Sequence, residues 1–299
     1  MTKLSDRMLT STDGRALAVA EWGTPSGTPV FQLHGTPGSR LGRHHDETLY
    51  DRLDMHLITY DRPGYGASDR RHGRRVVDAV EDIVTIADAL GIDRFVVGGG
   101  SGGAPHALAC AALLGDRVLS TFALVPVAPY EALGDQWLIG QAPSNVAEWT
   151  AALAGEDALI DYLSDQLKRM ADDPLNMLDD EEDLPPEDRE VMTRESVRVE
   201  FREMLAEAIR QGPAGWVDDD FAFLRPWGFD VSFIATPVLL AYGRSDTLAP
   251  VRHGEYLGRT IPGAEVRLMD SGHLSAMDHA EENWTRVLEI AARREADHH

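Results

Sequence analysis

The sequence predicts an α/β fold in which a mostly parallel central sheet is flanked by helices and interrupted by a helical insertion. Toward both ends of the chain, short apolar runs alternate with longer segments of helical periodicity, a pattern typical of parallel strands covered on both faces. Between residues 127 and 230 this alternation stops, and 25 Asp or Glu stand against 8 Lys or Arg. We therefore expect a core domain of residues 1–126 and 231–299, and an acidic helical cap over 127–230.

Composition narrows the class of protein. The chain has 299 residues, 43% of them hydrophobic, so it can bury a core without disulfides. Its single cysteine, Cys110, excludes an intramolecular disulfide and a cysteine metal cluster. The formal net charge of −22 argues against nucleic acid and anionic membranes as partners. No apolar run approaches the ~18 residues of a membrane span, and residues 1–20 lack a signal peptide's apolar centre. We expect a cytoplasmic protein with a small-molecule substrate and, as one possible assembly, a homodimer.

The elements expected before the insertion follow in chain order. The Asp-Gly pair at 13–14 introduces a strand over 15–22, and the short turns between the opening strands suggest an antiparallel edge. Helices are expected over 76–90, where Gly91 supplies a stop signal, and over 103–114. Further strands are expected over 29–33, 56–60, 94–97 and 119–127.

Inside the insertion the sequence predicts helices and no strand of the sheet. The helices are expected over 148–170 and 188–211. An acidic run rich in proline separates them, and we interpret it as a solvated loop or face. After the insertion the alternation returns, with strands over 237–242 and 265–269 and helices over 253–260 and 280–296.

A glycine cluster at 98–103 lies directly between an expected strand and an expected helix. Gly98, Gly100 and Gly103 satisfy the G-x-G-x-x-G pattern of dinucleotide-binding folds. That fold needs an acidic residue roughly 20 positions further on, at the end of the next strand. Here the next strand ends in Leu-Val-Pro, without an acid. The dinucleotide interpretation is therefore disfavoured, and we expect no cofactor.

The same cluster also matches G-x-S-x-G through Gly99, Ser101 and Gly103. In this motif the serine sits on a strained turn from strand to helix, where the helix dipole favours developing negative charge. A serine nucleophile needs a base, and the base needs a carboxylate to orient it. Asp246 and His273 each follow a later strand, at the sheet edge where open α/β folds place their sites. We assign Ser101 as nucleophile, His273 as general base and then acid, and Asp246 as the orienting group.

Five motifs together resemble the α/β-hydrolase superfamily, and the resemblance covers nearly the whole chain. They are H-G-T-P-G at 34–38, D-R-P-G-Y-G-A-S at 61–68, the elbow around Ser101, G-R-S-D at 243–246 and G-H at 272–273. The resemblance implies the α/β-hydrolase fold with an inserted cap, in its serine-nucleophile branch. It also implies an oxyanion hole made by the backbone N–H groups of Thr36 and Gly102.

Two other sets of residues compete for these roles. Asp270 lies three residues before His273 and is a second candidate for the orienting acid, although we expect it to face another direction. His44, His45 and Asp46 could imitate a metal site, but adjacent residues on a helix face apart and a fourth ligand is missing. We therefore expect no metal.

A serine nucleophile is compatible with the cleavage of esters, lactones, thioesters, amides and carbon–carbon bonds. It argues against the epoxide hydrolases and haloalkane dehalogenases of similar fold, which use a carboxylate. A small to medium carboxylic ester or lactone is the expected substrate, hydrolysed through an acyl-enzyme, because an alcohol leaves easily. The alternative is a proline-iminopeptidase-like aminopeptidase, whose substrate ammonium an acidic cap could hold; a third is a non-catalytic ligand-binding homologue. The candidate ammonium ligands are Glu195, Glu200, Glu203 and Glu207, and the candidate pocket aromatics are Trp137, Trp149, Trp216 and Trp227.

Overall fold

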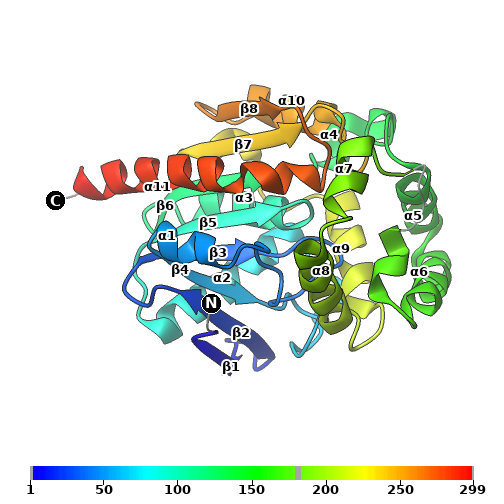
Figure 1. Cartoon of the computed structure of the whole chain (residues 1–299), viewed down its shortest axis with the longest axis horizontal. Helices are drawn as coiled ribbons and strands as arrows, with labels where there is room; N and C mark the ends of the chain where they lie inside the picture. Colours follow the sequence, from blue (N-terminus) through cyan, green and yellow to red (C-terminus); the bar gives the residue numbers. More distant parts are fainter. Residues whose placement is uncertain (1–2, 179–182, 298–299) are drawn as a thin grey trace.

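The computed structural model describes residues 3–178 and 183–297. Its centre is an eight-stranded sheet with the order β1-β2-β4-β3-β5-β6-β7-β8 (Figure 1). β2 runs antiparallel to both of its neighbours, and the other pairs are parallel. The predicted mostly parallel sheet is therefore confirmed. The strands are β1 (Ser5–Thr10), β2 (Ala16–Gly23), β3 (Thr28–Leu33), β4 (Met55–Tyr60), β5 (Phe95–Gly100), β6 (Val118–Leu124), β7 (Val238–Gly243) and β8 (Glu265–Met269).

Three strands, β1, β5 and β6, differ from the expected pattern. β5 continues three residues beyond its expected end, to Gly100. β1 was not expected as a separate strand, because it is an edge strand with mostly exposed residues and no apolar run marks it. β6 ends at Leu124, three residues before the expected end, where Val125 takes a φ of 42° and leaves the extended conformation. That turn matters for the site, because it lies beside the end of β5.

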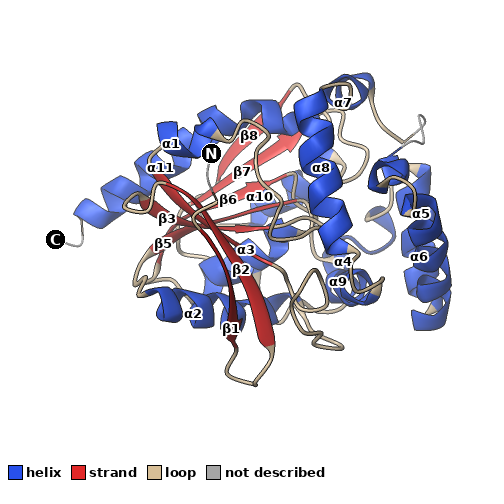
Figure 2. Ribbon diagram, turned by 60° about the horizontal axis from the view of Figure 1, so that its bottom comes forward, coloured by secondary structure: helices blue, strands red, loops and turns tan. Residues whose placement is uncertain are grey.

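Helices cover both faces of the sheet, as predicted (Figure 2). Successive residues of the central strands point to opposite faces of the sheet. Val96 belongs to the same buried cluster as Trp284 of α11, whereas Val97 belongs to the cluster of Ile83 on α2. The helices of the core are α1 (Thr48–Arg52) and α11 (Ala280–Ala296) on one face, and α2 (Ala79–Leu90), α3 (Gly103–Leu113) and α10 (Val251–Thr260) on the other. Short 3₁₀ turns, η1 (Val76–Asp78) and η5 (Ser275–His279), precede α2 and α11.

Between β6 and β7 the chain forms a helical insertion, which lies at one end of the sheet (Figure 1). The expected helix over 148–170 is two helices, broken at Gly155, whose φ of 126° suits glycine. The insertion contains α4 (Tyr130–Leu133), η2 (Gly134–Gln136), α5 (Pro143–Ala154), α6 (Glu156–Met170), η3 (Pro174–Leu178), α7 (Pro186–Val191), α8 (Glu195–Ala208) and α9 (Ala214–Leu224). The short turn η4 (Val231–Phe233) follows it, before β7.

The insertion shares one hydrophobic cluster with the sheet domain. Trp137 and Phe223 of the insertion belong to the same buried cluster as Ala104 and Leu108 of α3. This continuity fixes the insertion against the edge where β5, β7 and β8 end. In the described part of the chain, no helix is long and apolar enough to cross a membrane.

Candidate active site

Ser101 occupies a sharp turn between β5 and α3. Its φ is 51°, in the left-handed region that non-glycine residues rarely adopt. The Ser101 N–H donates to the Leu124 carbonyl at 2.9 Å, and the Ser101 carbonyl accepts from the Ala104 N–H at 3.0 Å. A Cβ at Gly99 would overlap the Gly103 carbonyl, and one at Gly103 would overlap the Leu33 carbonyl. The glycines of the motif are therefore required by close approach of the backbone.

His273 and Asp246 meet at the ends of β8 and β7. The His273 Nδ1 lies 2.8 Å from the Asp246 Oδ2, and the other Asp246 oxygen accepts from the N–H groups of Leu248 and Ala249 at 2.8 Å each. Burial by itself lowers the pKa of His273, but the charges of Asp246 and Asp188 outweigh it and raise that pKa above its usual value. The Asp246 carboxylate therefore favours the charged form of His273.

Asp270, the competing acid, points elsewhere. Its side chain is 91% exposed and pairs with Arg244 at 3.0 Å. Asp246, by contrast, has no exposed side-chain surface and touches the imidazole. The structure therefore brings Asp246, and not Asp270, to His273.

Thr36 follows β3 and contacts the elbow from the other side. A Cβ on Gly102 would overlap the Thr36 hydroxyl, so the two segments meet closely. Beneath them, the His34 Nδ1 lies 2.7 Å from the Gly35 carbonyl, and its Nε2 accepts the Arg62 N–H at 3.0 Å. Burial and the nearby Arg62 charge hold the pKa of His34 well below its usual value. His34 is thus a neutral support of this loop.

Asp219, on α9 of the insertion, holds the same loop from above. It is completely buried and accepts hydrogen bonds from the Thr36 hydroxyl at 2.7 Å, the Tyr65 hydroxyl at 2.9 Å and Arg62 at 2.6 Å. Burial opposes its ionisation, but the guanidinium groups of Arg62 and Arg74 outweigh burial and hold the pKa of Asp219 well below normal. Sequence reasoning missed this residue. The three consecutive acids at 218–220 do not show which one is buried or what it contacts.

Asp188, on α7, was also missed, and here the expectation of a solvated acidic run is wrong. Asp188 is fully buried and hydrogen-bonded to the turn that carries His273. Asp183 of the same run is buried too, and residues 179–182 lie outside the described residues. The sequence of this acidic run does not show that its last residue, Asp188, is buried against the His273 turn.

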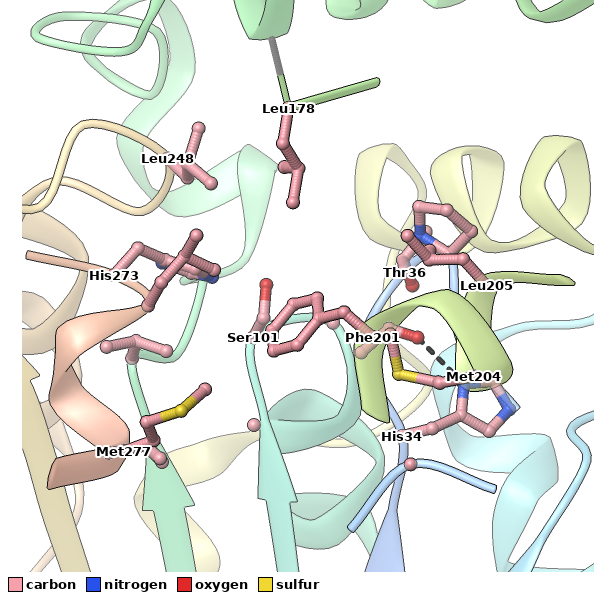
Figure 3. Close-up of a pocket in the computed structure, with 18 of the residues that line it drawn as sticks. His34, Thr36, Ser101, Leu178, Phe201, Met204, Leu205, Leu248, His273 and Met277 are labelled. Carbon is pink, nitrogen blue, oxygen red and sulfur yellow. Dashed lines mark hydrogen bonds between the residues drawn. The ribbon is translucent and has the colours of Figure 1, made fainter. Parts of the chain in front are cut away.

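Ser101, His273 and Thr36 all face one cavity of about 330 Å³. Figure 3 shows Ser101 at its centre, His273 on one side and Thr36 on the other. The space accommodates a small to medium organic group. Labelled apolar side chains surround the serine, namely Leu178, Phe201, Met204, Leu205, Leu248 and Met277.

Only two of the four candidate tryptophans line this cavity. Trp149 and Trp216 do so. Trp137 is fully buried beneath, and its Nε1 donates to the Ala128 carbonyl at 2.7 Å. Trp227 is 1% exposed and belongs to the hydrophobic cluster of the insertion. The density of aromatic residues in the sequence does not distinguish tryptophans that line the cavity from tryptophans that are buried in the core.

Two acidic residues of the insertion meet at the cavity wall. Glu148 accepts the Trp216 Nε1–H at 2.7 Å and lies beside Asp220, whose oxygens accept no hydrogen bond from the described residues. Burial raises the pKa of Glu148 to about 7, and burial beside Glu148 raises the pKa of Asp220 well above normal. Each carboxyl group of the pair is therefore harder to ionise than an exposed acid.

The four predicted ammonium ligands of α8 have different surroundings. Glu195 is exposed, Glu203 pairs with Arg43 at 3.4 Å, and Glu207 pairs with Arg40 at 2.5 Å. Glu200 alone lines the cavity; it accepts the Arg43 N–H at 3.0 Å, and burial raises its pKa to about 8.

Of the two histidines considered for a metal, His44 lines the cavity, whereas His45 is not among its lining residues. The ring centroids of His44 and His45 lie 4.3 Å apart, with the ring planes tilted by 32°. Within residues 3–178 and 183–297, no three His, Cys, Asp or Glu side chains converge in a group that could hold a metal ion.

Comparison with known proteins gives a consistent family. The model of the alpha/beta hydrolase fold matches residues 28–280. 2-Hydroxymuconate semialdehyde hydrolase from Pseudomonas putida is 25% identical over 276 residues, which is 91% of this chain and 90% of that protein. Proline iminopeptidase from Xanthomonas citri is 36% identical over 107 residues, 33% of each protein. The solved structure of a hydrolase from Pseudomonas aeruginosa superposes with a TM-score of 0.70 at 20% identity, over 96% of this chain and 98% of that one. This chain belongs to the alpha/beta hydrolase fold family.

Proposed function

We propose that the protein is a serine hydrolase that cleaves a small to medium carboxylic ester or lactone. Ser101 attacks the carbonyl carbon while His273 takes the hydroxyl proton, and Asp246 stabilises the imidazolium that forms. His273 then returns the proton to the leaving alkoxide, leaving an acyl group on Ser101. Water, deprotonated by His273, then attacks the acyl carbon; the bond to the Ser101 oxygen breaks, that oxygen takes the proton back from His273, and the acid is released. The observation that carries this proposal is a strained serine facing the same cavity as a buried His273–Asp246 pair.

The oxyanion of the tetrahedral intermediate would lie between Thr36 and Gly102. Their backbone N–H groups are the proposed donors, and one such donor contributes about 3–4 kcal/mol to the transition state. The close contact of Gly102 with Thr36 supports this assignment. We further propose that residues 127–230 act as a cap, because the insertion supplies much of the apolar wall, including Phe201, Met204 and Leu205.

Labelling with a fluorophosphonate tests the nucleophile directly. We expect one covalent adduct by intact mass on the wild type and none on Ser101→Ala, because only an activated serine reacts. A series of p-nitrophenyl esters of increasing acyl length would then measure how much of the apolar cavity the substrate fills. A folded wild type that neither reacts nor hydrolyses any ester would instead favour the non-catalytic ligand-binding alternative.

The carboxyl pair of Glu148 and Asp220 favours a second candidate, an aminopeptidase. A protonated amine entering the cavity would find two buried carboxyl groups that form no salt bridge with the described residues, although the Arg74 charge acts on Asp220 from a distance. Hydrogen bonds to charged groups contribute about 1.5–3 kcal/mol. Aminoacyl anilides compared with their des-amino analogues test this. We expect a preference of roughly 10-fold or more for the amine, lost in Glu148→Gln and kept in Asp161→Asn, an exposed acid of α6. Equal rates on both substrates would contradict the aminopeptidase proposal and leave ester hydrolysis as the remaining proposed activity.

A further inference from the structure

Asp188 of the insertion is bonded to the turn that carries His273. Its Oδ2 accepts the His273 N–H at 2.8 Å, and its Oδ1 accepts the Ser275 N–H at 2.8 Å and the Ser275 hydroxyl at 2.6 Å. The Ser275 oxygen in turn accepts the Gly272 N–H at 2.8 Å. One carboxylate therefore organises the hydrogen bonds of three of the four residues from 272 to 275.

The fit between α7 and this turn is close. A Cβ on Gly272 would overlap the Asp188 carboxylate, so the glycine before His273 gives the carboxylate its access. The neighbouring Glu187 accepts the hydroxyl of Ser245, directly before Asp246. Six residues beyond Asp188, Arg194 pairs with Asp278 at 2.5 Å. The segment from α7 to the start of α8 thus contacts both loops that form the His273–Asp246 pair.

We propose that Asp188 is a positioning residue for His273, so that the insertion forms a fixed part of the catalytic apparatus as well as a wall of the cavity. The proposal rests on the proposed function, in which His273 is the base. Asp188 touches no reacting atom. It acts through the His273 turn, because the imidazole is attached to the backbone that the carboxylate holds.

Two physical effects follow from this arrangement. The three donors fix the height and rotation of the turn, and a displacement near 1 Å can lower a rate about 100-fold. The negative charge of Asp188 also favours the imidazolium formed during the reaction. Asp246 and Asp188 are the charged groups that act on the His273 ring, from the loop after β7 and from α7, and both raise its pKa against the effect of burial.

The test compares Asp188→Asn with Glu190→Gln. Both changes remove one negative charge from α7, but Glu190 is exposed. In Asp188→Asn we expect kcat to fall roughly 10- to 100-fold with little change in KM. We also expect the acidic limb of the pH profile to move about one unit lower, since the imidazolium loses a favourable neighbour. Glu190→Gln should match the wild type in both. Equal profiles for the two variants would overturn the proposal.

A readout without turnover separates this proposal from the proposed function. In the Ser101→Ala background, NMR titration of histidine-labelled protein gives the pKa of His273 with and without Asp188→Asn. A lower pKa supports the positioning role, and an unchanged value contradicts it. If Ser101→Ala or Asp246→Asn were fully active, the proposed function itself would fail, whatever Asp188 does.

Ser275→Ala keeps the test decisive should Asp188→Asn fail to fold. It removes one of the three donors and keeps the carboxylate, so the acidic limb should stay in place while kcat falls about 3- to 10-fold. Wild-type kcat in this variant would show that the hydrogen bonds of Asp188 do not position the base.

Discussion

The sheet and the helical insertion both contribute to the site, but by different physical means. The sheet carries Ser101, Asp246 and His273 on turns at the ends of β5, β7 and β8, where local backbone geometry decides how each side chain points. The insertion instead extends buried carboxylates toward those turns. Asp188 reaches the His273 turn across 85 residues of sequence, and Asp219 reaches Thr36 across 183.

This difference separates the groups that we propose to react from the buried groups that hold them in place. A reacting group on a turn can be replaced without disturbing the packing around it, so its loss should change the chemistry and leave the fold intact. A buried carboxylate with several donors belongs to the packing, and its loss should change the stability as well. The four predictions below test that division, beginning with the largest expected effect.

Ser101→Ala tests the sheet side of the comparison. Removing the hydroxyl should lower ester turnover by at least about 10⁴-fold, because the remaining groups only bind and polarise the substrate. The midpoint of thermal unfolding should stay close to that of the wild type, since the methyl group fills the same space. Both quantities are measured on the same preparation. Substantial turnover by the variant would remove Ser101 as the nucleophile.

Asp219→Asn tests the insertion side. The amide is nearly isosteric but leaves Arg62 and Arg74 buried without their shared counter-ion, so the free energy of unfolding should fall by about 3–5 kcal/mol. Urea denaturation measures the loss. Asp161→Asn, at an exposed site on α6, is the control and should stay within about 0.5 kcal/mol of the wild type. If the two variants were equally stable, the insertion would not be held by its buried carboxylates.

Glu200→Gln sharpens the comparison through pH. Because burial raises the pKa of Glu200 to about 8, the folded protein keeps a proton that the unfolded chain releases near its ordinary value of 4.5. The folded state then binds more protons, so stability falls as pH rises through that window. Between pH 5 and 7 the wild type should lose about 2 kcal/mol more than Glu200→Gln. Denaturation of both proteins at the two pH values gives this difference, and identical slopes would contradict it.

The smallest of these effects concerns the rate in mildly acidic solution. The pKa of His273 lies above its usual 6.5 despite burial, because Asp246 and Asp188 outweigh the burial effect. Protonated His273 cannot accept the Ser101 proton, so kcat/KM should fall about tenfold per pH unit below a midpoint above 6.5. A pH profile of ester hydrolysis provides the measurement. A flat profile down to pH 5 would exclude a histidine base.

The same division explains how far the sequence could lead. The sheet was predictable from the alternation of apolar runs. The Ser101 turn was predictable because close backbone contacts require glycine at 99 and 103, and this requirement appears in the sequence as a short motif. Asp188 and Asp219 were not, since each is one of 25 acids in the insertion and its partners are distant in sequence. Likewise, nothing in the local pattern separates Trp149 at the cavity from Trp137 in the core beneath it.

The lone thiol of the chain offers a use unconnected with hydrolysis. Cys110 lies on α3, completely buried against the sheet, and burial raises its pKa to about 12. A thiol is reactive only as the exposed thiolate, so alkylating reagents should reach Cys110 only when α3 leaves the sheet. The rate at which Cys110 is labelled then measures how often α3, the helix that follows the Ser101 turn, separates from the sheet. The Cys110 thiol is thus a natural probe of local opening of the structure, and no dye has to be introduced.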